Sequence, residues 1–175
     1  MMRKFLLALL LWVSFLLQTT VFKNLGFTTV APNLLLIVTV SSAFMRGRKE
    51  GMLVGFFAGL LIDLFYGAFF GYYALLYVLV GFAVGSFWDV FFDKDIKMPL
   101  LLVGVSDLAL NLVIYVTRFL VRGRFRLDIY MVEIILPEIV FTMIMTLIVY
   151  RLIYAINHRF QDRSKEGRHS LWAKE

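Results

Sequence analysis

The stretch GMLVGFFAGLLIDLFYGAFFG, residues 51–71, carries a glycine or an aspartate at every fourth position. Residues four apart lie on one side of an α-helix, because each turn takes about 3.6 residues. Glycine weakens a helix in water, but a bilayer enforces backbone hydrogen bonding and makes this loss tolerable. The stretch therefore predicts a membrane-embedded helix with a row of small residues and an acid at its edge. The row consists of Gly51, Gly55, Gly59, Asp63, Gly67 and Gly71.

The composition of the whole chain indicates that its solvent is a bilayer. Hydrophobic residues make up 61% of the 175 residues, against about 45–50% in ordinary soluble domains. The chain has no cysteine, which excludes a disulfide framework, a thiolate nucleophile and a cysteine metal site. The net charge of +6 is typical of the basic loops of membrane proteins, so we expect no nucleic-acid partner.

Six apolar segments approach the length of about 20 residues that a membrane span requires. The first resembles a signal peptide, but no small-x-small cleavage site follows it, so we interpret it as a retained span. The sequence predicts an all-α polytopic membrane protein, a bundle of six transmembrane helices in one domain (1–157) with a polar, frayed cytoplasmic tail (158–175). The predicted spans are about 5–22, 30–45, 51–66, 72–91, 98–119 and 130–156.

The lysines and arginines between these spans predict the orientation. With the N-terminus inside, 13 of the 18 Lys and Arg residues lie on the cytoplasmic side, which favours an N-in, C-in topology. The loop at 118–128 is an exception to this rule, because the N-in topology places its four arginines outside. We interpret them as interfacial side chains that reach the headgroups, with an anionic partner as the alternative. These arginines are Arg118, Arg122, Arg124 and Arg126.

A second row of small residues follows in the fourth span, where Gly81 and Gly85 are again four apart. Small residues let membrane helices approach closely, since lipid leaves no hydrophobic drive between them. Two such rows on consecutive helices predict that the third and fourth spans pack against each other or jointly present a groove to a partner.

Polar residues also fall inside the predicted spans: Asp63, Asp107, Asn111 and Glu138, with Pro137 beside the last. A charge at the bilayer centre costs about 2.5–3.5 kcal/mol, so such side chains face the bundle interior. They either cap and hydrogen-bond neighbouring helices or line a polar groove. Pro137 is expected to kink the sixth span, and Pro32 to open the second.

These residues form no recognisable catalytic set. Asp63 and Asp107 would suit an acid–base pair, but their contexts, LLIDLF and GVSDLA, lack the glycine-x-glycine-aspartate pattern of intramembrane aspartyl proteases. Both histidines, His158 and His169, fall in the tail, so neither is placed in the membrane to bind a metal. We therefore expect no enzyme activity, no metal and no cofactor.

The segment APNLLLIVTVSSAFMRGRKEGMLVGFFAGLLIDLFYGAFFGYYALLYVLVGFAVG resembles the core of the rod shape-determining protein MreD family. The shared features are a proline opening the second span, a basic loop, the glycine–aspartate row, a glycine in the turn and another in the next helix. The residues that carry them are Pro32, Gly51, Gly55, Gly59, Asp63, Gly71 and Gly81. The resemblance covers nearly the whole chain and includes the late proline, Pro137.

This resemblance implies a non-enzymatic component of the bacterial cell-elongation machinery in the plasma membrane. Members of the family act with the bitopic protein MreC, the filament protein MreB, the polymerase RodA and a class B penicillin-binding transpeptidase. They help to place lateral peptidoglycan synthesis and to maintain rod shape. The expected partners are therefore these proteins and membrane lipid. The resemblance implies no small-molecule substrate.

Chains of this kind also look similar to the substrate-binding subunits of energy-coupling-factor vitamin transporters, which are six-helix proteins of similar size. In that alternative the loop from Arg118 to Arg126 would form a gate above an outward-facing solute pocket. The pocket would be lined by Asp63, Asp107, Asn111 and Glu138. Polar groups are sparse for a vitamin site, which favours the scaffold interpretation.

Overall fold

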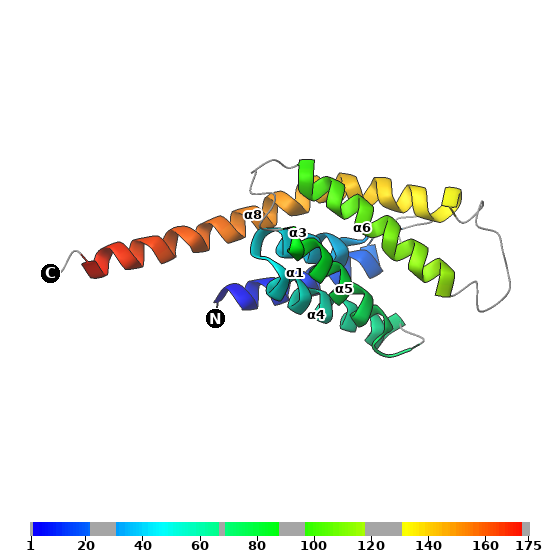
Figure 1. Ribbon diagram of the computed structural model, residues 1–175, viewed down its shortest axis with the longest axis horizontal. Coiled ribbons are helices and arrows are strands. Elements are labelled where there is room, and N and C mark those ends of the chain that lie inside the picture. The colour runs from blue at the N-terminus through cyan, green and yellow to red at the C-terminus, as the bar shows by residue number, and fades with distance from the viewer. Residues whose placement is uncertain (1, 22–30, 67–68, 88–96, 118–130, 173–175) are drawn as a thin grey trace.

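The computed structural model describes residues 2–21, 31–66, 69–87, 97–117 and 131–172. Within these ranges the chain is helical and contains no strand (Figure 1). The helices are α1 (Met2–Leu16), η1 (Leu17–Val21, a π-helix), α3 (Leu34–Arg46), α4 (Arg48–Tyr66), α5 (Tyr72–Ser86), α6 (Lys97–Tyr115), η3 (Met131–Ile135, a π-helix) and α8 (Leu136–Trp172). Five residues singled out from the sequence lie outside the described ranges: Gly67, Arg118, Arg122, Arg124 and Arg126.

Several helix ends differ from the predicted spans. α4 begins at Arg48, before the predicted start at Gly51, and α5 ends at Ser86, before the predicted end at residue 91. α8 continues to Trp172, so the tail that was predicted to be frayed is helical up to that residue. Figure 1 shows this part of α8 projecting beyond the other helices.

In the part of the chain that the structure describes, two helical segments are long and apolar enough to cross a membrane, Lys97–Tyr115 and Met131–Ala155. Shorter apolar helices cover Phe5–Val21, Leu34–Arg46 and Tyr72–Ser86. The all-helical class is therefore confirmed, whereas six transmembrane crossings and their orientation stay a prediction.

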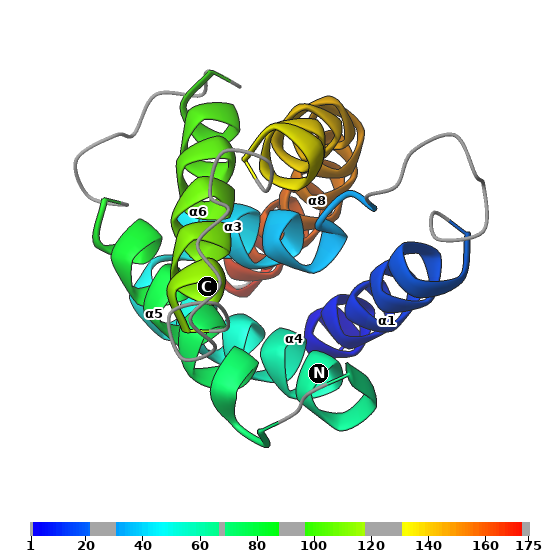
Figure 2. The same cartoon turned by 90° about the vertical axis from the view of Figure 1, so that its right-hand side faces the viewer.

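α3 lies at the centre of the bundle, and α1, α4, α5, α6 and α8 surround it (Figure 2). Every side chain from Leu34 to Phe44 is buried. A helix that is buried on all sides and 13 residues long is typical of a core helix rather than of a span that faces lipid. The second predicted span is thus the core of the fold, and its helix begins at Leu34 rather than at residue 30.

Asparagine and glycine set the two ends of α3. Asn33 is its N-cap, so Pro32, which was expected to open the helix, precedes the cap. Gly47 alone separates α3 from α4, and its φ of 83° belongs to the region that favours glycine. Its N–H donates to the carbonyl oxygen of Ala43 at 2.8 Å. This single-residue connection places α4 directly against α3.

Pro137 lies where one helix type changes into another. The backbone is a π-helix over Met131–Ile135 and becomes α-helical at Leu136. Proline has no N–H to donate, and near the start of an α-helix no such donor is needed. The helix is therefore not a continuous α-helix at Pro137, and the kink predicted there stays a prediction.

Candidate functional site

The two glycine rows pack directly against each other between α4 and α5. A Cβ atom built on Gly51 would lie 2.7 Å from the carbonyl oxygen of Gly81, and one built on Gly85 would lie 2.6 Å from the Cα atom of Arg48. A Cβ atom on Gly55 would overlap the carbonyl oxygen of Tyr77. Backbone atoms cannot move aside as a side chain can, so only glycine permits this approach. Of the two arrangements predicted from the sequence, the contacts of Gly51, Gly55, Gly59, Gly81 and Gly85 correspond to packing of α4 against α5.

Asp63 continues the row on α4 and caps the next helix. Its Oδ1 accepts a hydrogen bond from the N–H of Tyr73 at 3.0 Å, and its Oδ2 accepts from the N–H groups of Gly71 at 3.1 Å and Ala74 at 2.9 Å. These donors lie at the start of α5, where N–H groups lack partners within the helix and the helix dipole favours a negative charge. Asp63 is 4% exposed and is a structural cap, one of the two roles predicted for the membrane acids.

Asn33 connects four helices. Its Oδ1 accepts from the N–H of Leu36 at 3.3 Å and from the hydroxyl of Tyr77 at 2.7 Å. Its Nδ2 donates to Oδ1 of Asp107 at 3.3 Å, and its backbone N–H donates to the hydroxyl of Thr142 at 3.0 Å. These partners belong to α3, α5, α6 and α8, so one residue at the start of α3 links four helices.

Asp107 lies in this network with no exposed surface. Its Oδ1 accepts from Asn33, while its buried Oδ2 has no hydrogen-bond partner among the described residues. Asn111, one turn later on α6, donates from Nδ2 to the backbone carbonyl of Asp107 at 3.1 Å. The acid and the amide singled out from the sequence are thus neighbours, although this bond from the amide goes to the backbone and not to the carboxylate.

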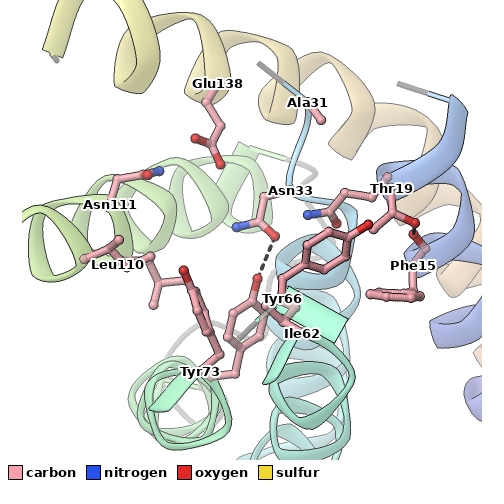
Figure 3. A pocket seen from close by; sticks show the side chains of 13 residues that line it. Phe15, Thr19, Ala31, Asn33, Ile62, Tyr66, Tyr73, Leu110, Asn111 and Glu138 are labelled. Carbon is pink, nitrogen blue, oxygen red and sulfur yellow. Dashed lines mark hydrogen bonds between the residues drawn. The ribbon is translucent and has the colours of Figure 1, made fainter. Parts of the chain in front are cut away.

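A cavity of about 290 Å³ opens beside this network (Figure 3). Its walls come from the C-terminal ends of α1, α4 and α6 and the N-terminal ends of α3, α5 and α8. The lining holds four aromatic rings, three side-chain amides and one carboxyl, that of Glu138. Figure 3 shows Glu138 reaching from α8 towards the space between Asn111 and Asn33, with Tyr73 rising from the opposite wall.

The structure therefore divides the predicted intramembrane polar residues into two groups. Asp107, Asn111 and Glu138 gather at or beside the cavity, whereas Asp63 serves the α4–α5 hairpin and does not line the cavity. Within the described ranges, no three His, Asp or Glu side chains are placed to hold a metal ion.

The sequence alone does not show that Asn33, Tyr77 and Thr142 form a connected group. Asn33 carries a signal, because asparagine directly before an apolar run is typical of an N-cap. Tyr77 and Thr142 carry none, since each lies within an apolar segment and reaches Asn33 only through tertiary packing. Gly104 was also missed: it lies on α6 against the tip of Met143 on α8, and no second glycine at helical spacing marks it.

Comparison with known proteins gives one match. The family model described as rod shape-determining protein MreD matches residues 1–160 of the chain. No curated protein and no solved structure matches. The match spans nearly the whole helical region and confirms the resemblance drawn from the glycine–aspartate row.

Proposed function

Because the chain belongs to the MreD family of rod shape-determining proteins, we propose that it is a non-enzymatic component of the bacterial cell-elongation complex in the plasma membrane. It binds other membrane proteins and so helps to organise lateral peptidoglycan synthesis and to maintain rod shape. Its expected partners, implied by the family resemblance, are MreC and, through MreC, the proteins MreB, RodA and a class B penicillin-binding transpeptidase.

The exposed side of α8 is the observation that carries this proposal. Ile144 and Ile148 on α8 are 55% and 64% exposed, and Val132 on the preceding η3 is 64% exposed, whereas Thr142 and Thr146 on the opposite side of α8 are fully buried. An apolar surface of this kind suits lipid or another membrane helix. With its preceding π-helix, the apolar part of α8 covers 25 residues, enough to offer a partner helix a contact across the whole bilayer.

The closed α4–α5 hairpin supports the choice of α8. Gly55 and Gly81 face the backbone of each other's helix, so the glycines within α4 and α5 are used in packing these two helices together. Association of membrane helices depends on close packing over a matched surface. We therefore place the docking surface on the exposed side of α8.

The proposed topology is N-in and C-in. The cavity gathers C-terminal ends of three helices and N-terminal ends of three others at one end of the bundle. Helices that alternate in direction in this way return both termini to one side of the membrane. The excess of Lys and Arg on that side, 13 of 18 residues, supports assigning it to the cytoplasm.

Photo-crosslinking from single cysteines tests the docking surface, since the natural chain has none. A photoactivatable reagent would be attached at Ile144→Cys on α8 or, as a control, at Leu75→Cys. Leu75 is 60% exposed and lies on α5, across α3 from α8 (Figure 2). In native membranes we expect Ile144→Cys to capture a second membrane protein, MreC being the first candidate, and Leu75→Cys to capture it far less.

Two results would overturn the proposed docking surface. One is lipid adducts alone at Ile144→Cys, and the other is equal capture of the same protein from both positions. Capture of a transporter ATPase with its coupling membrane subunit would instead support the vitamin-transporter alternative.

A further inference from the structure

The cavity at the meeting point of six helix ends has an unusual charge balance. Among the described residues, its lining includes Glu138 but no lysine, arginine or histidine. Asp107, directly bonded to the lining residue Asn33, adds a second buried carboxyl whose Oδ2 has no hydrogen-bond partner among the described residues. Buried acidic groups are costly when ionised unless an opposite charge or hydrogen-bond donors compensate them. The described lining does not supply that opposite charge.

The other polar groups of the lining are already bonded and hold a fixed shape. The hydroxyl of Tyr77 donates to Oδ1 of Asn33, and Oε1 of Gln18 accepts from the N–H of Leu35 at 3.3 Å. Asn111 is held through the backbone carbonyl of Asp107. A ligand would therefore meet a preorganised wall, which lowers the entropic cost of binding.

Aromatic rings supply the second half of a cation site. Phe15, Tyr66, Tyr73 and Tyr77 line the same cavity, and Figure 3 shows Tyr66 and Tyr73 on the walls opposite Glu138. The faces of such rings attract ammonium groups, by about 0.5–1 kcal/mol when exposed and about 2 kcal/mol when desolvated. A carboxylate on one wall and rings on the others are the combination that recognises an organic cation.

We propose that this cavity binds an alkylammonium group, either a free amine or the amine headgroup of a phospholipid. The volume of about 290 Å³ lies at the lower limit of ligand pockets, so it fits a headgroup rather than a large solute. Tyr66, 51% exposed, extends the lining to the surface of the bundle and leaves room for an attached chain. This inference does not depend on the proposed role in cell elongation.

The test uses the purified full chain in nanodiscs of phosphatidylglycerol, to which phosphatidylethanolamine or free ethanolamine is added. Binding is read from the melting temperature and, for the lipid, from native mass spectrometry. We expect either amine to raise the melting temperature of the wild type. Glu138→Gln keeps the size and polarity of the side chain but removes its charge, so we expect an affinity at least tenfold lower. Glu133→Gln changes an exposed acid of η3 and should bind as the wild type does.

The two amine probes separate the sources of the ligand. Stabilisation by ethanolamine as well as by the lipid indicates recognition of the headgroup alone, and stabilisation by the lipid only indicates a lipid site. Should Glu138→Gln misfold, Tyr66→Leu serves as the second variant, because it removes an aromatic wall at a half-exposed position. The proposal is overturned if neither amine binds, if Glu138→Gln and Tyr66→Leu both bind like the wild type, or if ethylene glycol stabilises as well as ethanolamine.

Discussion

Replacing Asp63 tests whether a carboxylate, and not merely a polar group, holds the α4–α5 hairpin. Both carboxylate oxygens accept hydrogen bonds, one from Tyr73 and two from Gly71 and Ala74. Asparagine has a single oxygen, so Asp63→Asn can keep at most the two bonds made by Oδ2. Its amide N–H₂ would then face the N–H of Tyr73, donor against donor. Asp63→Leu keeps no bond at all.

The magnitudes follow from the number of bonds lost. A hydrogen bond to a charged group contributes about 1.5–3 kcal/mol in soluble proteins, and side-chain bonds between membrane helices contribute about 0.6 kcal/mol on average. At roughly 1 kcal/mol for each bond, between these limits, Asp63→Asn should lower the free energy of unfolding by about 1–2 kcal/mol. Asp63→Leu should lower it by about 3–5 kcal/mol, because its three donors at the start of α5 also lose their cap.

Reversible unfolding in mixed SDS micelles, followed by circular dichroism, measures these free energies. Glu133→Gln is the control, since Glu133 is an exposed acid on η3 and its change should stay within about 0.5 kcal/mol. Wild-type stability of Asp63→Asn, or equal losses in the Asn and Leu variants, would show that the three bonds do not hold the hairpin.

Three further perturbations address other contacts. Gly55→Ala should cost about 1–3 kcal/mol of unfolding free energy, because its Cβ meets the backbone of α5. Gly104→Ala should cost less than about 1 kcal/mol, because only the flexible tip of Met143 must move. Equal melting temperatures of the two variants would contradict this difference. Asn33→Leu should cost about 2–4 kcal/mol by leaving buried partners in α5 and α6 unbonded. Proteolysis of the folded protein should detect the loosened packing of these helices against α3, and unchanged resistance would contradict this expectation. Gly47→Ala should cost about 1–3 kcal/mol through strain at positive φ, measured by the same SDS unfolding, where a neutral result would contradict the strain.

The helical class and the α4–α5 packing could be predicted from the sequence, because both depend on local patterns. Apolar runs of membrane length mark the helices, and Gly51, Gly55 and Gly59 mark a face that permits close approach. The pattern could not decide whether that face meets the chain's own helix or another protein. That choice depends on Gly81 and Gly85 lying opposite, which only the fold of the hairpin establishes.

The cavity could be predicted only in part. Because Asp107 and Glu138 are acids within apolar segments, the sequence indicated that they face the interior. The hydrogen bonds of Asn33 join residues 74 and 109 positions apart, and such long-range bonds do not affect the local sequence pattern. Hydropathy also could not distinguish α3 from a lipid-facing span. A core helix and a span are equally apolar, and only the surrounding helices show which one α3 is.

The central position of α3 has a consequence for biogenesis. The ribosome makes α3 before α4, α5, α6 and α8, the helices that come to surround it. At 13 residues, α3 is shorter than the roughly 17–25 residues of a stable span, so we expect it to remain near the translocon until its neighbours emerge. Nascent chains that stop before α5 should therefore be degraded by membrane quality control much faster than chains that stop after α6, and pulse-chase labelling of such truncations measures the difference. Insertion of this protein is then a collective event, completed late in translation, rather than a series of independent helix insertions.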